Sequence, residues 1–251
     1  MVSVGRRQNI LSDENISEIV ELLNTDDKNS RLISIEEVAE NEYVLNPSRY
    51  LQRETVVKNG VFFETVIKNI TRGAQIKASV LDEIVSDEPT NMQYLMLANL
   101  QDGIISDELP YLKGIDSKYE KYCIKNGSLV ISKNASPVKM AIVSVQEGNK
   151  ILANGNLYVI ELDKDKINPY FLKAYLESES GKAALSRVAV GATLLNLPVE
   201  GLKKVIIPLP DLESQKKIAD QYYAKLSEIK ELKYKLEKAT EELEHIYTEE
   251  K

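Results

Sequence analysis

The 251-residue sequence has no tryptophan, one cysteine and one histidine, and aromatic residues make up only 6% of it. A single thiol, Cys123, cannot form an internal disulfide framework. With His245 as the only imidazole, we expect no structural zinc site, no other metal and no cofactor. No run of about 18 apolar residues is present, so no transmembrane helix is expected. The first residues, MVSVGRRQNILSDEN, lack the apolar core of a signal peptide, which favours a cytoplasmic protein.

Groups that carry catalysis are also sparse. His245 lies near the end of a predicted long helix, where it is a poor general base, and Cys123 has no histidine partner in a recognisable pattern. Two segments, Asn46-Pro47-Ser48-Arg49 and Asn168-Pro169-Tyr170-Phe171, approach the Asn-Pro-Pro-Tyr motif of adenine methyltransferases. Both lack the second proline, and no glycine-rich cofactor loop follows a strand. We therefore expect Asn168 and Pro169 to begin a helix, and we expect the chain not to be an enzyme.

Charge is distributed unevenly along the chain, whose net charge is −7. Residues 1–54 carry 6 basic and 11 acidic side chains, residues 55–210 carry 18 and 17, and residues 211–251 carry 8 and 11. An acidic chain does not bind nucleic acid through its overall charge. Only the middle segment is not repelled overall by phosphates, so DNA binding would require a local basic patch there.

Two short helical segments are predicted near the N-terminus. Ser12 is a suitable N-cap for a helix over 12–24, whose apolar face contains Ile16, Ile19, Val20 and Leu23. Residues 30–41 predict a short strand followed by a helical turn, with Ser34 and Glu37 in the spacing of a capping box. These segments indicate a short helical arm.

Short apolar runs separated by turn residues fill the middle of the chain. Strands are predicted at Asn91–Leu100, Leu129–Ser132, Met140–Val145 and Ala153–Leu162, and a strand or turn at Val80–Ile84. The pattern predicts an α+β (mixed α/β) fold: a domain with a small mixed sheet, a long C-terminal coiled-coil helix and the short helical N-terminal arm. The expected division is an arm at 1–54, a sheet-containing domain at 55–210 and a long helix at 211–251.

The final helix has the clearest pattern, because neither glycine nor proline occurs between Glu213 and Glu249. Apolar residues recur every seven positions, as in a coiled coil, with Lys225 as a polar exception. About 36 helical residues would be roughly 54 Å long, too long to bury this seam against one small domain. A partner helix is therefore expected, from this chain or from another, as in a homodimer. The predicted seam is Ile218, Tyr222, Ile229, Leu232, Leu236, Leu243 and Ile246.

Two stretches, NGSLVISKNASPVKMAIV and NPYFLKAYLESESGKAALSRVAVGATLLNLPVEGLKKVIIPLPDLESQKKIADQ, resemble a target-recognition domain. This module belongs to the specificity subunit of type I restriction–modification systems. The resemblance covers about residues 80–215, and the long helix extends it to about 250. It departs from the family pattern at Asn126-Gly127-Ser128 and at Ser136-Pro137-Val138. The resemblance implies binding of double-stranded DNA and gives Lys133, Lys139, Arg187, Gly191 and Thr193 as candidate contacts.

A second resemblance covers residues 5–51, in GRRQNILSDENISEIVELL and SIEEVAENEYVLNPSRYL. These segments are similar to the C-terminal tail of the modification (methyltransferase) subunit of the same systems. The resemblance implies methyltransferase subunits, and also a restriction subunit, as partners. With one recognition domain and one long helix, the chain resembles half of a specificity subunit. Two alternatives stay open: a protein-interaction scaffold without DNA binding, and the C-terminal portion of a methyltransferase–specificity fusion.

Overall fold

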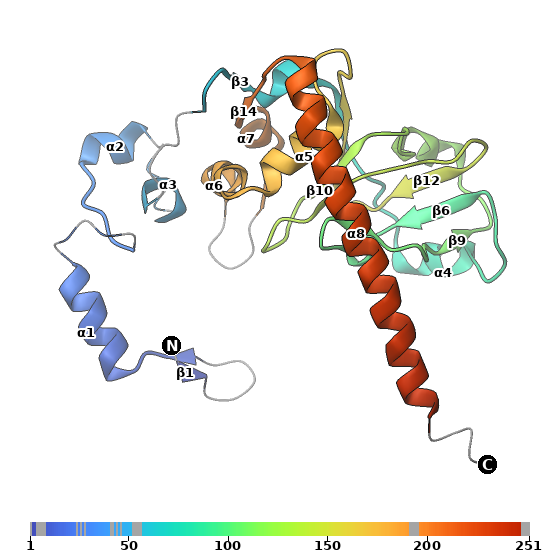
Figure 1. The fold of residues 1–251 in the computed structure, drawn as a ribbon, viewed down its shortest axis with the longest axis horizontal. Coiled ribbons are helices and arrows are strands. Elements are labelled where there is room, and N and C mark those ends of the chain that lie inside the picture. The colour runs from blue at the N-terminus through green and yellow to red at the C-terminus, as the bar shows by residue number, and fades with distance from the viewer. Residues whose placement is uncertain are drawn as a thin grey trace. The chain divides into compact units, whose positions relative to one another are not determined.

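The computed structural model describes residues 2–3, 9–23, 29–40, 47–51, 57–190 and 196–246, and the single positions 25, 27, 43 and 45. The chain forms two compact units, Met1–Thr55 and Val56–Lys251, which are described separately (Figure 1). The further division of the second unit into a domain and a helix stays a prediction.

The N-terminal unit consists of short elements. Ser12 caps its first helix by accepting a hydrogen bond from the Asn15 backbone amide at 3.3 Å, as predicted. Ser34 accepts one from the Glu37 amide at 3.1 Å. The strand expected at the start of 30–41 is wrong, because residues 31–34 are irregular and only an isolated bridge joins Asp27 to Ser30. The elements are β1 (Val2–Ser3) and β2 (Asn9–Ile10), which pair antiparallel, then α1 (Asp13–Leu22), α2 (Ile35–Glu40) and α3 (Pro47–Leu51).

Two four-stranded sheets form the centre of the second unit, in the orders β11-β10-β13-β4 and β12-β6-β9-β5. The first is antiparallel, whereas β12 and β6 of the second run parallel. The predicted α+β class with a small mixed sheet is confirmed. The strands are β4 (Ile67–Arg72), β10 (Leu129–Ser132), β11 (Met140–Ile142) and β13 (Leu157–Leu162), then β5 (Val85–Ser86), β6 (Met92–Leu95), β9 (Tyr111–Leu112) and β12 (Lys150–Ala153).

Smaller elements surround these sheets. Two further strand pairs are antiparallel, one between β3 and β14 and one forming the β7–β8 hairpin. These elements are β3 (Gly60–Phe62), η1 (Phe63–Val66), α4 (Ala78–Ile84), η2 (Leu97–Asn99), β7 (Leu100–Gln101), β8 (Ile104–Ile105), η3 (Ser117–Tyr122), α7 (Val199–Lys203) and β14 (Ile206–Pro208).

Burial explains why β10 matches its predicted bounds. It lies between β11 and β13, and all four of its side chains are buried. Leu129 and Ile131 pack in the cluster that includes residues of α5 and α8, whereas Val130 packs in the cluster between the two sheets. A strand covered on both faces is largely apolar, as at Leu129, Val130 and Ile131, so its pattern is unambiguous.

Other strand predictions are corrected. Ala153–Leu162 is two strands in different sheets, because the turn at Asn154–Asn156 separates β12 from β13. Val80–Ile84 belongs to helix α4, since helical spacing places Leu81 and Ile84 together against the Met92–Tyr94–Leu112 cluster. The strand predicted at Asn91–Leu100 is shorter, because β6 ends at Leu95 and a 3₁₀ turn follows. The strand predicted at Met140–Val145 is also shorter, since β11 ends at Ile142.

Four helices follow the sheets: α5 (Pro169–Glu177), α6 (Glu179–Val188), α7, and α8 (Leu212–His245). Asn168 caps α5 by accepting from the Tyr170 amide at 2.9 Å, with Pro169 at the first helical position, as predicted. Helix α8 packs against α5 near its own N-terminus, where Gln215 is buried. The Gln215 amide accepts from the Asn168 backbone at 2.8 Å and donates to the Pro210 carbonyl at 2.8 Å.

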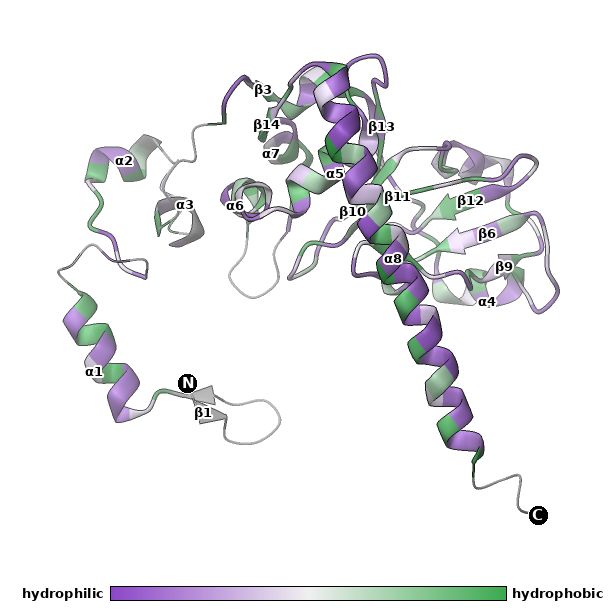
Figure 2. Cartoon of the chain, in the orientation of Figure 1, coloured by the Kyte–Doolittle hydropathy of each residue, from purple (hydrophilic) through white to green (hydrophobic). Residues whose placement is uncertain are grey.

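The far half of α8 differs from the near half. Every residue from 234 to 246 is exposed, and Figure 2 shows apolar and polar residues alternating along it. In the part of the chain that the structure describes, no helix is both long and apolar enough to cross a membrane.

Candidate nucleic-acid interface

Three neighbouring strands of the first sheet have their ends side by side. At this end of the sheet, β4 ends at Arg72, β10 ends at Ser132 and β13 begins at Leu157. The segments beyond these ends are tied together by backbone hydrogen bonds. The Lys133 amide donates to the Asn156 carbonyl at 2.8 Å, and the Leu197 amide donates to the Lys133 carbonyl at 2.9 Å. We call this place the loop junction; it comprises residues 72–74, 133–134, 154–156 and 196–197.

The predicted DNA contacts lie at or near the junction where they are described. Lys133 is part of it and is half-buried. Lys139 is half-buried just before β11. Arg187 lies in the last turn of α6. Gly191 and Thr193 lie outside the described residues. The residues that flank this gap, Val190 and Asn196, exchange two backbone hydrogen bonds of 2.8 Å.

Four cations, of which Arg72 and Lys133 belong to the junction, differ from most lysines of the unit. Among the residues that the structure describes, no carboxylate forms an ion pair with Arg72, Lys133, Lys139 or Lys182. Arg72 instead donates through Nε to the Gly155 carbonyl at 2.7 Å. Cations without carboxylate partners can neutralise phosphates at less cost, because no internal ion pair must be broken. The sequence did not single out Arg72 or Lys182, since a lone cation near a strand or helix end carries no motif.

A cleft of about 700 Å³ lies beside Lys139 and Lys182. Its other lining residues include Gly103 of the β7–β8 turn and Tyr222 of α8. The pKa of Asp102 in the same turn is lowered, first by its hydrogen bond with Lys233 and to a smaller degree by the charge of Lys139. This cleft is therefore lined by both cations and carboxylates, since Asp102 and Glu177 contribute to it beside Lys139 and Lys182.

Helix α8 is attached to α5 by a polar cluster. Lys173 is fully buried, pairs with Glu177 at 2.8 Å and bonds the Tyr222 hydroxyl, which in turn donates to Glu177. Burial lowers the pKa of Lys173, and Glu177 opposes this shift. Burial and the bond to Glu177 raise the pKa of Tyr222. Tyr222, which the heptad pattern places on the pairing seam, therefore also contacts its own domain.

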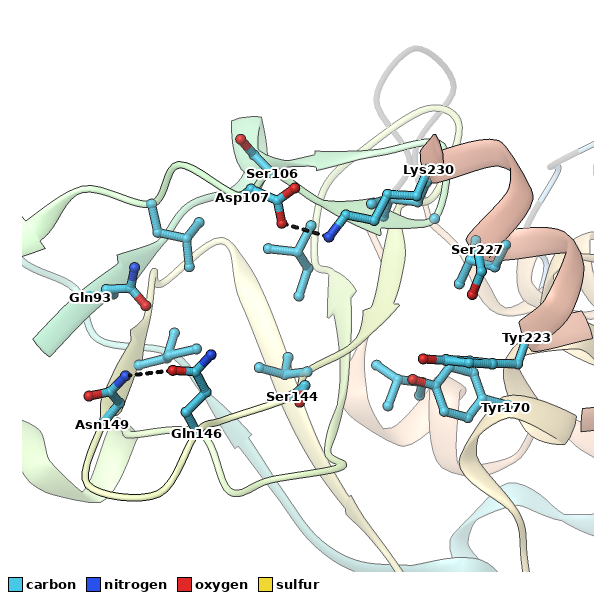
Figure 3. A pocket seen from close by; sticks show the side chains of 18 of the residues that line it. Gln93, Ser106, Asp107, Ser144, Gln146, Asn149, Tyr170, Tyr223, Ser227 and Lys230 are labelled. Atoms are coloured by element: carbon cyan, nitrogen blue, oxygen red, sulfur yellow. Dashed lines mark hydrogen bonds and ion pairs between the residues drawn. The ribbon is translucent and has the colours of Figure 1, made fainter. Parts of the chain in front are cut away.

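A second cleft, of about 520 Å³, lies between the sheets and α8; we call it the α8 cleft (Figure 3). Amides and a hydroxyl line one wall, whereas α8 contributes Tyr223. The ring of Tyr223 packs edge-on against that of Tyr170, with 4.9 Å between the ring centroids. Lys230 Nζ pairs with Asp107 at 2.6 Å. Acidic residues flank the lining residues in sequence: Asp87, Glu88, Glu108 and Glu147. The polar wall consists of Gln93, Ser144, Gln146 and Asn149.

The predicted helix seam is largely uncovered. Only Tyr222 is half-buried, while Leu236 and Leu243 are each 69% exposed. The remaining members, Ile218, Ile229, Leu232 and Ile246, are also exposed. In the N-terminal unit the apolar face of α1 is exposed at Ile16, Ile19 and Val20. No group of three or more histidine, cysteine or carboxylate side chains is placed to hold a metal within the described ranges.

Two family models match parts of the chain. The model of the type I restriction modification DNA specificity domain matches residues 82–242, and the model of N-6 DNA methylase matches residues 1–59. No match was found among curated protein sequences.

Solved structures are also similar. One chain, from a study of complex assembly and conformational transition of the type I R-M system, is 16% identical with a TM-score of 0.51, and covers 93% of this chain and 53% of that one. The type I restriction–modification S subunit from M. genitalium is 13% identical (TM-score 0.44, 68% and 39% covered). The HsdS subunit from Thermoanaerobacter tengcongensis is 17% identical (TM-score 0.46, 87% and 49% covered). The chain thus spans about half the length of the first of these structures.

Proposed function

Since this chain belongs to the family of type I restriction modification DNA specificity domains, we propose that it selects the DNA sequence on which a type I restriction–modification system acts. The family match over residues 82–242 carries this proposal, because it joins the sheet domain and most of α8 in one unit. Phosphate contacts are assigned to Lys133 and Lys139, which form no ion pair among the described residues, and to Arg187, Gly191 and Thr193. The chain itself would supply no catalytic residue.

Pairing of two chains through α8 completes the proposed architecture. The chain has one long helix whose far half exposes Leu232, Leu236 and Leu243. A seam of this length stabilises a helix only when a second helix covers it. Two copies arranged antiparallel would place their recognition domains at opposite ends, and the two-fold dimer would read a split palindromic site.

The N-terminal unit is assigned to protein contacts. Its match to N-6 DNA methylase over residues 1–59 supports recruitment of methyltransferase subunits, with a restriction subunit as a further partner. Helix α1 exposes an apolar face and carries Asp13, Glu14 and other acidic residues but no basic residue. An acidic surface suits a protein partner better than DNA.

A scaffold without DNA binding is the second candidate, and the net charge of −7 is the observation that favours it. The two candidates differ in one measurable property, which is salt-sensitive retention of DNA. A methyltransferase–specificity fusion would instead show a cofactor loop and an Asn-Pro-Pro-Tyr motif encoded upstream of the chain.

Size-exclusion chromatography with light scattering tests the proposal, with and without a randomised duplex pool and with a methyltransferase subunit added. We expect a dimer that retains a sequence-enriched DNA fraction at low and moderate salt. The variant Leu236→Glu with Leu243→Glu should be monomeric, whereas the matched control Glu237→Gln with Glu244→Gln should stay dimeric. A protein that ignores DNA at every salt concentration, alone and with the methyltransferase, would favour the scaffold.

A further inference from the structure

The loop junction includes the asparagines Asn134, Asn156 and Asn196. Asn156 and Asn196 are exposed, and Asn134 is half-buried. Asn134 and Asn196 form a backbone bridge, and the Asn156 carbonyl accepts from Lys133. Among the described residues, none of the three side-chain amides is used in a hydrogen bond within the chain. Each amide therefore keeps a donor and an acceptor available to a ligand.

Asn156 is held in place by a chain of contacts. Its backbone amide donates to Asn154 Oδ1 at 2.9 Å, and Asn154 Nδ2 donates to the buried Tyr94 hydroxyl at 2.6 Å. On the other side Gly73 approaches so closely that a Cβ there would lie 2.2 Å from the Asn154 carbonyl oxygen. The loop that presents Asn156 is thus built on the sheets, and a rigid support is what precise recognition requires.

Charge around the amides fits a nucleic acid. Arg72 ends β4 and Lys133 directly follows β10, the two strands that flank β13, and neither cation forms an ion pair among the described residues. The two cations therefore lie on either side of Asn156, just as the base edges of a groove lie between two phosphate backbones. The α8 cleft also presents amides, but its Lys230 is paired with Asp107 and acidic residues flank it.

We propose that the loop junction reads adenine in the major groove of the target, with Asn156, Asn134 and Asn196 at the base edges and Arg72 and Lys133 on the flanking phosphates. The proposal rests on the DNA-selecting function above and names the base-reading residues for it. A primary amide is suited to adenine because it can accept from N6 and donate to N7 at once. Apolar or acidic side chains in these positions could not make that pair.

Selection from a randomised duplex pool, with the full chain and its methyltransferase partner, tests base reading. The unmodified chain should enrich adenine at fixed positions. Asn156→Ala should lower discrimination at one of them by about 5- to 140-fold, without changing the salt dependence. Asn156→Asp should shift the preference there from adenine to cytosine, since a carboxylate only accepts hydrogen bonds. A folding defect cannot produce such a shift. Gln146→Ala, in the α8 cleft, is the matched amide control and should change nothing.

The phosphate role has a different signature. Arg72→Ala and Lys133→Ala should each weaken binding to all sequences alike and reduce the slope of log K against log salt by about 1. Lys121→Ala, an exposed lysine on η3, should leave the slope unchanged.

Two failures can be told apart. If the unmodified chain enriches a motif that Asn156→Ala, Asn156→Asp and Asn196→Ala leave intact, the base-reading assignment is overturned and the DNA-selecting function stands. If the unmodified chain retains no DNA with its partner present, the proposed function fails and the assignment fails with it.

Discussion

The loop junction and the α8 cleft belong to the same unit and both present primary amides, yet their charges differ. At the junction Arg72 and Lys133 form no ion pair with any described residue. In the α8 cleft Lys230 is paired with Asp107 at 2.6 Å. Amide groups alone therefore do not mark a nucleic-acid surface. The pairing state of the nearest cations distinguishes the two sites, because phosphate binding must replace whatever those cations already contact.

The two sites also differ in how they are held. Backbone hydrogen bonds between strand ends support the junction, such as the 2.9 Å bond from Gly73 to Leu157. One wall of the α8 cleft is a helix, which is attached through side chains of Lys173, Tyr222 and Lys230. Salt should therefore weaken the exposed pair of Lys230 with Asp107 at the cleft, whereas the backbone bonds of the junction should not respond to it.

The largest expected effect follows from reversing the junction's charge. Arg72→Glu with Lys133→Glu should weaken DNA binding by about 100-fold at 0.1 M salt, because two phosphate contacts are lost. Fluorescence anisotropy over a salt series measures both the affinity and its slope. Lys118→Glu with Lys121→Glu, on η3, changes the net charge by the same amount elsewhere in the unit. This control should weaken DNA binding much less. Equal losses in the two double variants would mean that overall charge, and not the junction, binds DNA.

The second-largest effect is expected at the polar cluster that Lys173, Glu177 and Tyr222 form between α5 and α8. Tyr222→Phe removes a hydroxyl bonded to both Lys173 and Glu177, and should lower the free energy of unfolding by about 1.5 to 3 kcal/mol at neutral pH. Urea titration measures this loss. Base recognition by the junction should be unaffected, so a changed DNA motif in this variant would contradict the separation of the two sites.

The same tyrosine should make stability depend on alkaline pH. Its pKa is raised in the folded state by burial and by Glu177, so above pH 10 the unfolded chain loses a proton that the folded chain keeps. Stability therefore falls as pH rises above 10. Lys173 has the opposite effect at lower pH, because burial lowers its pKa in the folded state. Below the ordinary pKa of lysine, its contribution to stability therefore rises with pH. Urea titrations of Tyr222→Phe should show a shallower alkaline loss than those of the unmodified chain, and parallel curves would exclude this role.

Alanine substitutions at two glycines, one at each site, test how tightly the backbone is packed there. Gly73→Ala should cost about 1 to 3 kcal/mol, because its Cβ would collide with the Asn154 carbonyl. DNA binding should weaken as well, since the loop carrying Asn156 would move. Gly148, in the loop between Gln146 and Asn149, has φ +82° and open space around it. Gly148→Ala should cost about 1 kcal/mol through backbone strain and leave DNA binding intact. Thermal melts and anisotropy measure the two properties separately.

The smallest effect is expected at the rim of the α8 cleft. The pair of Lys230 with Asp107 is exposed, so Asp107→Asn should cost only about 0.2 to 1 kcal/mol. The cost should decrease at high salt. Urea titrations at two salt concentrations measure it, with Asp87→Asn as the control. A loss that persists unchanged at 1 M salt would show that Asp107 acts through packing and not through charge.

Local signals in the sequence predicted local structure well. Ser12, Ser34 and Asn168 are helix caps as expected, and β10 matches its predicted bounds. The errors fall on short apolar runs at Val80–Ile84 and Ala153–Leu162. Such runs have no decisive period, and the neighbouring elements decide whether they become a helix, one strand or two.

The sequence by itself determined the α+β class, the long helix with its apolar repeat, the family resemblance and the caps, because each depends on residues close together in the chain. Only the tertiary structure decided which loops meet at the junction. Arg72 contacts Gly155 across 83 positions, and that contact exists because β4 and β13 are paired in register. Tyr222 likewise belongs to a seam by its spacing, but Lys173 and Glu177 of α5 determine what it touches. Long-range strand pairing and helix packing carry no short sequence motif, and they alone bring these residues together.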